Sequence, residues 1–300
     1  MKKILITGPN GFVGTNLLIY LFGFDVAKLN RSDYDKNLLN QHLKNIYAVI
    51  HLAGKSHDIK KVTSSKDYYL ANTELTKVLF DEFLVSNAKV FITLSSVKAV
   101  TDEVNGELTE QFNPNPLTHY GKSKLLAEQF IMSKELPKGK RLYVLRPCMI
   151  HGPGNKGNLN LLYKFVSRNI PWPLGTFENK RSFCSIDNLM FIIKELIERE
   201  DIPSGVYNVA DDDPLSTNEL INLMAIIQNR KPKIWKISKR LIKGIAIIGN
   251  KLHLPLNIDR LQKLTSSYVV RNTKIKAAIG KPLPVSSREG LLKTFISFNS

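Results

Sequence analysis

The chain has 300 residues, 43% of them hydrophobic, and its 43 Lys and Arg outweigh 26 Asp and Glu to give a formal net charge of +17. Hydrophobic residues this frequent exclude a disordered chain. The two cysteines exclude a disulfide framework and lack metal-ligand spacing, so we expect no metal site and a reducing compartment. No apolar run is long enough for a signal peptide or a membrane span, which predicts a cytoplasmic protein.

Short apolar runs and segments with helical spacing alternate through the first half. Runs rich in aliphatic and β-branched residues predict strands, at 3–7, 25–29, 47–52, 90–94 and 141–145. Apolar residues at helical spacing predict helices, at 11–22, 68–86 and 120–136. This regular succession is typical of α/β proteins and predicts a doubly wound parallel sheet of the Rossmann type, with helices on both faces.

Three glycines stand between the first predicted strand and the first predicted helix. Gly8, Gly11 and Gly14 allow a tight turn and a close approach of a diphosphate to the free amides of the helix N-terminus. This placement predicts a dinucleotide site. In NAD enzymes the second strand usually ends in an acid that holds the ribose 2′-hydroxyl. Here the strand is followed by Asn30 and Arg31, and the first acid, Asp33, comes three residues after Asn30. NAD and NADP therefore both remain open.

After Ile150 the regular alternation of predicted strands and helices ends. Glycine-rich loops at 152–158 and 171–175 precede short predicted helices and strands. We therefore divide the chain into a dinucleotide-binding Rossmann domain over 1–150 and a smaller mixed α/β substrate lobe over 151–300. Some segments of this lobe are expected to return to the Rossmann sheet.

Residues 230–248 interleave Lys and Arg with apolar residues and contain no acid. Such a segment is typical either of a solvated helix whose apolar side faces the core or of a helix that lies on an anionic membrane surface. Both interpretations stay open. No nucleic-acid motif accompanies the charge, so we expect no nucleic-acid partner.

Tyr120 and Lys124 are four residues apart on a predicted helix and therefore share one face. A neighbouring ammonium favours the phenolate, which predicts a lowered pKa for Tyr120 and proton exchange with an alcohol or ketone during hydride transfer. The strand at 90–94 ends in Ser95 and Ser96. Hydroxyls at the carboxyl end of a parallel strand are expected to face the ligand crevice.

A series of short motifs is spread along nearly the whole chain. They are Thr7-Gly8 to Gly14, His51-Leu52-Ala53-Gly54, Asn72-Thr73, Leu94-Ser95-Ser96-Val97-Lys98, Tyr120-Gly121-Lys122-Ser123-Lys124, Leu145-Arg146-Pro147, Gly152-Pro153-Gly154 and Arg181-Ser182-Phe183. Together they resemble extended short-chain dehydrogenases/reductases of the nucleotide-sugar epimerase/dehydratase family. The resemblance implies a catalytic set of Tyr120, Lys124 and Ser96, with Ser95 as the alternative hydroxyl beside the reacting sugar oxygen. It also implies a cofactor site, which comprises Gly8, Asn10, Gly11, Phe12, Val13, Gly14, Asn30, Arg31, Leu52, Ala53, Gly54, Asn72, Leu94, Tyr120, Lys124 and Pro147.

The second lobe is similar to that of the subgroup acting on UDP-sugars in surface-polysaccharide pathways. The resemblance implies that Arg181 binds the diphosphate of a UDP-sugar, a use for which its planar fork is suited. The other implied substrate residues are Ser95, Ser96, Asn158 and Lys263. The resemblance further implies that two copies pair as a homodimer.

The resemblance leaves several activities to weigh. A dehydratase needs an acid pair directly after the catalytic hydroxyl, and Val97 and Lys98 stand there, so dehydration is disfavoured. We place a UDP-hexose 4-epimerase with bound NAD first. An NADPH-dependent reductase of a UDP-4-keto-6-deoxyhexose is the alternative, which the end of the second strand favours. A non-catalytic dinucleotide-binding protein is disfavoured, because Tyr120 and Lys124 are both present.

Overall fold

The computed structural model describes residues 2–30, 33–34, 36–56, 64–155, 157–251 and 257–299. Its main feature is a six-stranded parallel sheet in the order β2-β1-β3-β4-β6-β9. The strands are β1 (Lys3–Thr7), β2 (Asp25–Leu29), β3 (Ala48–His51), β4 (Val90–Leu94), β6 (Arg141–Pro147) and β9 (Gly205–Val209). This confirms the predicted Rossmann-type sheet, and its first five strands lie where the sequence placed them.

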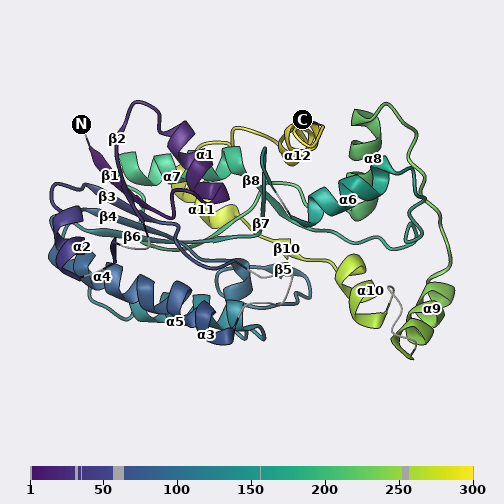
Figure 1. Cartoon of the computed structure of the whole chain (residues 1–300), viewed down its shortest axis with the longest axis horizontal. Coiled ribbons are helices and arrows are strands. Elements are labelled where there is room, and N and C mark those ends of the chain that lie inside the picture. The colour runs from purple at the N-terminus through teal and green to yellow at the C-terminus, as the bar shows by residue number, and fades with distance from the viewer. Residues whose placement is uncertain are drawn as a thin grey trace.

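Helices cover both faces of this sheet (Figure 1). One face carries α1 (Phe12–Tyr20), α7 (Ile186–Glu198) and α11 (Thr273–Ile279), and the other carries α2 (Lys36–His42), α4 (Leu75–Val85) and α5 (His119–Met132). Each face of the sheet has its own hydrophobic core, and the side chains of successive strand residues point alternately into one core and the other. Ile4 and Ile6 pack on the α1 side, and Leu5 packs on the α4 side. Because both faces are covered, the inner strands β3 and β4 consist almost entirely of buried apolar residues.

Two predicted helices differ in extent from the structure. The helix expected at 68–86 starts earlier and consists of α3 (Ser65–Tyr69), one π-helical turn (Leu70–Glu74) and α4. A regular helical period cannot reveal such a wider turn. The helix expected at 120–136 ends at Met132, where the hydroxyl of Ser133 donates to the carbonyl of Phe130.

Most of the second half forms a group of short elements beside the sheet (Figure 1). They are β7 (Met149–His151) paired with β8 (Phe183–Ser185), and α6 (Asn158–Ser167), α8 (Thr217–Ile227), α9 (Lys239–Lys251), α10 (Ile258–Thr265) and α12 (Ser287–Ile296). A second small pair joins β10 (Val269–Val270) to β5 (Glu107–Leu108), and a 3-10 turn spans Val97–Ala99. β9, α7 and α11 come from this half but lie on the main sheet. None of the helices in the described ranges has both the length and the apolar character to cross a bilayer.

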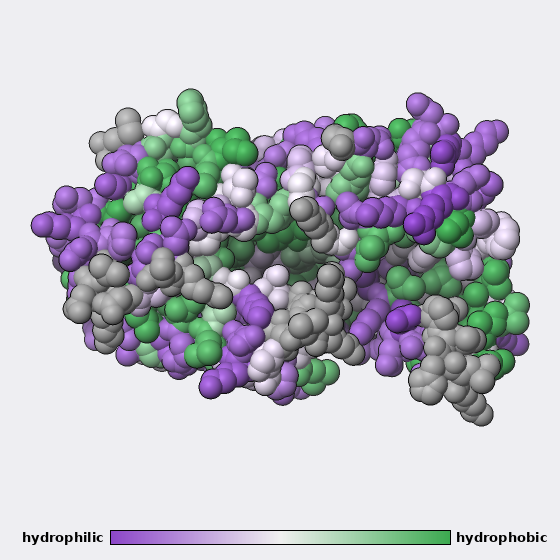
Figure 2. Space-filling model, viewed as in Figure 1, coloured by the Kyte–Doolittle hydropathy of each residue, from purple (hydrophilic) through white to green (hydrophobic). Residues whose placement is uncertain are grey.

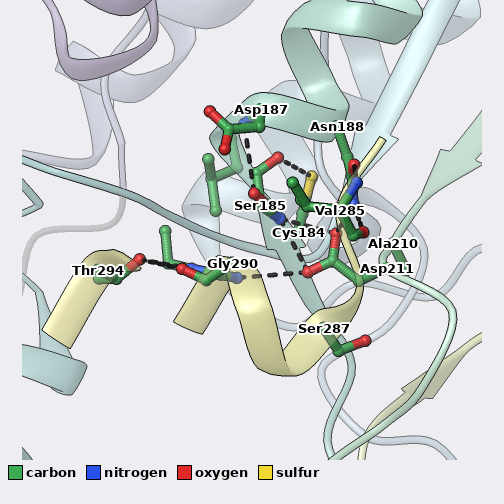
Figure 3. A network of polar contacts seen from close by, with 12 residues as sticks. Cys184, Ser185, Asp187, Asn188, Ala210, Asp211, Val285, Ser287, Gly290 and Thr294 are labelled. Carbon is green, nitrogen blue, oxygen red and sulfur yellow. Dashed lines mark hydrogen bonds and ion pairs between the residues drawn. The ribbon is translucent and has the colours of Figure 1, made fainter. Parts of the chain in front are cut away.

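A buried polar network fixes the start of α7 (Figure 3). Asp211, which follows β9, accepts hydrogen bonds from the backbone N of Ser185 at 2.9 and 3.0 Å and from Nδ2 of Asn188 at 2.7 Å. His151 Nε2 lies 3.3 Å from the same carboxylate, and its Nδ1 lies 2.9 Å from the hydroxyl of Thr294. The network therefore ties β7, β8, α7 and α12 to the end of β9.

Candidate active site

A cleft of about 800 Å³ lies at the carboxyl ends of the central strands. Figure 2 shows a hollow in the middle of the molecule, between its two ends. Fourteen of the predicted residues line this cleft, namely Gly8, Asn10, Gly11, Phe12, Val13, Gly14, Leu52, Gly54, Leu94, Ser95, Ser96, Tyr120, Lys124 and Pro147. The lining also includes residues that sequence reasoning missed, namely Thr15, Asn16, Lys55, Ser56, Cys148, Ile150, Pro153, Gly154, Asn155 and Gly157. The glycine-rich loop at 152–158 was a usable signal for Pro153, Gly154, Asn155 and Gly157.

The glycine turn between β1 and α1 fits a diphosphate. Gly8 has φ +65°, and a Cβ there would come within 2.9 Å of the Ala53 backbone. A Cβ on Gly14 would lie 2.3 Å from the carbonyl oxygen of Gly8, so only glycine lets α1 approach the turn this closely. The N-cap residue of α1 is Gly11, which has no side chain to bind the first amides, and the first turn carries no acid. These amides are therefore available to an anion.

We expect Gly14→Ala to lower the affinity for a dinucleotide by about tenfold or more, because the added methyl pushes α1 away from the Gly8 carbonyl. Isothermal titration with NAD and with NADP measures this loss. Gly244→Ala is the matched control, since a Cβ at that helical position meets nothing within 4 Å. Equal dinucleotide affinity in the Gly14 variant and in the native protein would contradict the prediction.

A chain of hydrogen bonds fixes the loop after β3. The hydroxyl of Thr76 donates to a backbone carbonyl and therefore accepts from Nε2 of His51 at 2.9 Å. Thr7 Oγ1 accepts from the amides of Leu52 at 3.1 Å and Ala53 at 2.9 Å, so its O–H donates to Nδ1 of His51 at 2.9 Å. Burial and, to a lesser degree, a nearby lysine lower the pKa of His51 to about 3, so this histidine is a neutral support and not an acid–base group.

Asn72, on the π turn, fixes the next part of the same loop. Its Oδ1 accepts from the amide of Lys55 at 2.7 Å, and its Nδ2 donates to the Lys55 carbonyl and to Ser123 Oγ, both at 3.0 Å. A Cβ on Gly54 would come within 2.7 Å of the same Oδ1. Asn72 therefore lies behind the cleft wall and positions the loop that forms it. Its predicted direct contact with a cofactor stays a prediction.

Tyr120, at the start of α5, hydrogen-bonds through its side chain to Ser96. The ring of Tyr68 lies edge-on to it, with the two centroids 6.2 Å apart. Burial raises the pKa of Tyr120 above its ordinary value, and the Ser96 hydrogen bond only opposes this. The expectation that Lys124 lowers this pKa is therefore wrong for this structure, because the desolvation of the phenol dominates. This hydrogen bond brings together two of the three residues of the expected catalytic set.

Lys124 points to the same cleft from the next turn of α5. Its Nζ donates to the carbonyl of Leu94 at 2.9 Å, and a Cβ on Gly54 would lie 3.1 Å from it. Burial lowers the pKa of Lys124 to about 8, and the carboxylate of Glu128 partly opposes this. The ammonium therefore stands at the end of β4, on the wall of the cleft that Tyr120 also lines.

This buried lysine makes stability depend on pH. Its pKa is about 8 in the folded protein against an ordinary value of 10.5, so the unfolded chain holds more protons between these values. The native protein should therefore gain stability relative to Lys124→Met as the pH rises through this window, by about 3 kcal/mol in total. Urea denaturation at both ends of the window measures the difference. Lys122→Met, at an exposed position of the same helix, should show no such trend, and a pH-independent difference for Lys124→Met would contradict this account.

Ser95 faces a buried ion pair behind the cleft. Its hydroxyl donates to Glu128, and Glu128 also accepts from Arg146 Nε at 3.1 Å and pairs with its guanidinium. The side chains of Glu128 and Arg146 are only 4% and 7% exposed. Because the Ser95 hydroxyl already has this acceptor, Ser96 is the hydroxyl that meets Tyr120. Sequence reasoning did not anticipate this support, although Glu128 follows Lys124 by one helical turn.

The other predicted residues that the structure describes are not part of the lining of the cleft. The amide of Asn30 donates to Asp33 Oδ2 at 2.9 Å, which places a carboxylate at the end of β2, and Arg31 lies outside the described residues. The guanidinium of Arg181 donates to the carbonyl of Lys263 and to Ser266. The side chain of Lys263 is exposed, as is Asn158 at the start of α6. The substrate contacts of Arg181, Lys263 and Asn158 stay predictions. No cluster of metal-ligating side chains occurs among the described residues.

Known proteins resemble this chain in sequence and fold. A profile of the NAD dependent epimerase/dehydratase family matches residues 4–210. UDP-glucose 4-epimerase from Vibrio cholerae is 31% identical over 331 aligned residues, covering 99% of this chain and 95% of that protein. N-acetyl-alpha-D-glucosaminyl-diphospho-ditrans,octacis-undecaprenol 4-epimerase from Escherichia coli O157:H7 is 26% identical, with 91% and 84% covered. MoeE5 in complex with UDP-glucuronic acid and NAD has a TM-score of 0.77 at 21% identity, with 99% of each chain covered. The chain therefore belongs to the NAD dependent epimerase/dehydratase family.

Proposed function

We propose that this protein is an NAD-dependent 4-epimerase of a UDP-hexose in surface-polysaccharide biosynthesis. The observation that carries the proposal is that Tyr120, Ser96 and Lys124 line the same cleft as the glycine turn, with Tyr120 hydrogen-bonded to Ser96. The similarity to UDP-glucose 4-epimerase over 99% of the chain supports the same substrate class. The intact set disfavours a non-catalytic binding protein, since such a protein has no use for a buried phenol paired with a hydroxyl.

Each residue of the set has a task in this reaction. In its ionised form, the phenol oxygen of Tyr120 takes the proton of the C4 hydroxyl and later returns it to the 4-keto sugar, and Ser96 orients the phenol through their hydrogen bond. Lys124 supplies positive charge in the same cleft, at the end of β4, and charge of this sign favours the ionised phenol, whereas burial opposes its ionisation. Bound NAD supplies the hydride acceptor at C4 and then the donor. The glycine turn and the loop held by Asn72 hold the dinucleotide in place throughout.

The dinucleotide preference follows from the end of β2. The amide of Asn30 holds the carboxylate of Asp33 at this position. A carboxylate there can accept a hydrogen bond from the ribose 2′-hydroxyl of NAD, and its charge repels the 2′-phosphate of NADP. Contrary to the expectation from the sequence, the end of β2 thus favours the epimerase over the reductase, because the epimerase keeps one NAD and the reductase consumes NADPH.

Lys98 argues against dehydration. It stands where a dehydratase needs an acid, and its Nζ donates to the carbonyl of Asp102 at 3.0 Å and lies 4.3 Å from the centre of the Tyr268 ring. Burial lowers the pKa of Lys98, but a lysine held in this way cannot replace the carboxylate. No proton transfer at C5 is therefore expected.

The test is to identify the nucleotide that copurifies with the protein by mass spectrometry and then to assay a panel of UDP-sugars without added cofactor. We expect bound NAD and interconversion of a pair of C4 epimers. Consumption of NADPH with a UDP-4-keto-6-deoxyhexose, without interconversion, would establish the reductase instead. The absence of both activities over the panel would contradict a catalytic role. Sedimentation of the same sample tests the predicted homodimer.

A further inference from the structure

Helix α9 has two apolar sides, and only one of them faces the core. Ile242 and Ala246 are 2% and 0% exposed and pack into the second-half core. Leu241, Ile245 and Ile248 are 57%, 42% and 56% exposed. Because they are spaced by four and three residues, these three form one continuous outer stripe. Packing on the core therefore explains the inner side of the helix but leaves the outer stripe unexplained.

Basic side chains are concentrated in α9 and in the segment that leads into it. Arg230, Lys231, Lys233, Lys236, Lys239, Arg240 and Lys243 are all exposed, and no Asp or Glu occurs from 230 to 251. Trp235, in the segment that leads into α9, is 57% exposed. At the start of this segment, an open cleft of about 580 Å³ is lined by Arg230, Lys231 and Lys233 together with Arg168 from the end of α6. Figure 1 places α9 at the far end of the molecule from the sheet, and Figure 2 shows apolar side chains gathered there.

We propose that the outer stripe of α9, with Trp235 and the lysines and arginines of residues 230–243, binds the surface of an anionic lipid bilayer. The apolar stripe enters the boundary between headgroups and acyl chains, where tryptophan is also favoured, and the cations meet lipid phosphates. A second copy of the chain is the weaker candidate, because a two-fold interface would bring two acid-free basic surfaces together. This contact goes beyond the proposed reaction and does not depend on it.

The experiment is flotation of the full-length protein with vesicles of phosphatidylcholine mixed with phosphatidylglycerol, and with vesicles of phosphatidylcholine alone. We expect binding to the anionic vesicles that weakens as salt is added. The double variant Leu241→Ser with Ile248→Ser should bind at least about tenfold more weakly, because it removes the apolar stripe at unchanged charge. Lys236→Gln with Lys243→Gln should reduce both the affinity and its salt dependence.

The matched control is Phe22→Ser with Val85→Ser, which removes two large apolar side chains that are 93% and 78% exposed on the sheet domain. This control should float like the native protein. No flotation of the native protein with anionic vesicles at low salt would overturn the proposal, and so would equal losses in the stripe variant and the control. Conversion of a dimer to monomers by the stripe variant, seen by sedimentation in the absence of lipid, would assign the stripe to a second copy. Thermal melting of each variant identifies any loss caused by unfolding.

Discussion

Tyr120→Phe is expected to reduce the interconversion of UDP-sugars by roughly 10²–10⁴-fold, because the variant has no group that can exchange a proton with the C4 oxygen. The fold and the affinity for NAD should be unchanged, since the ring remains in place against Tyr68. Turnover measured at saturating substrate, together with titration of NAD, separates these effects.

Tyr69→Phe is the control for this change. It removes the same atom from a tyrosine whose hydroxyl lies 3.2 Å from His119 Nδ1 on the surface near the start of α5. Its activity should match that of the native protein. Full activity of Tyr120→Phe would rule out the assigned base, whereas loss of activity in both variants would point to a disturbed helix start.

The largest effect on stability is expected from Glu128→Gln. This change leaves the guanidinium of Arg146 buried opposite a neutral amide, and the loss of one partner of a buried ion pair typically costs about 3–5 kcal/mol. The free energy of unfolding from urea denaturation at neutral pH measures the loss. Activity should also fall, because Glu128 supports Ser95 at the end of β4 and opposes the lowering of the pKa of Lys124.

Glu198→Gln provides the comparison. Its carboxylate pairs with Lys194 at 2.8 Å, but both side chains are more than a third exposed. Such surface pairs contribute about 0.3–0.5 kcal/mol. A loss for Glu128→Gln as small as this would show that Arg146 finds another partner or reaches water.

The sequence was sufficient for the main sheet, and the reason is physical. β1 and β4 have the predicted bounds because each is a short, mostly apolar run that ends at a turn or at polar residues, and β2 has them although it includes Asp25 and Lys28. The glycine turn and the spacing of Tyr120 and Lys124 were likewise visible, since both depend on residues close together in the chain. Patterns formed by residues close together in the chain therefore predict local structure without knowledge of the tertiary contacts.

Features set by distant contacts were not visible. The raised pKa of Tyr120 depends on how deeply packing buries it, which no spacing encodes. The guanidinium of Arg181 donates to groups more than eighty residues away. The π turn that directs Asn72 toward Lys55 has no sequence period of its own. The sequence therefore indicated the reacting groups, and the structure was needed for the residues that position them.

The position of β9 has a consequence for synthesis on the ribosome. β6 spans Arg141–Pro147, but its outer neighbour β9 is encoded at Gly205–Val209, and Asp211 closes the network at α7 only after that. At about 5–20 residues per second, the nascent chain presents an uncovered strand edge for roughly 3–12 seconds. Soluble yield should therefore respond to chaperone supply and to slow growth during expression, whatever the stability of the finished enzyme.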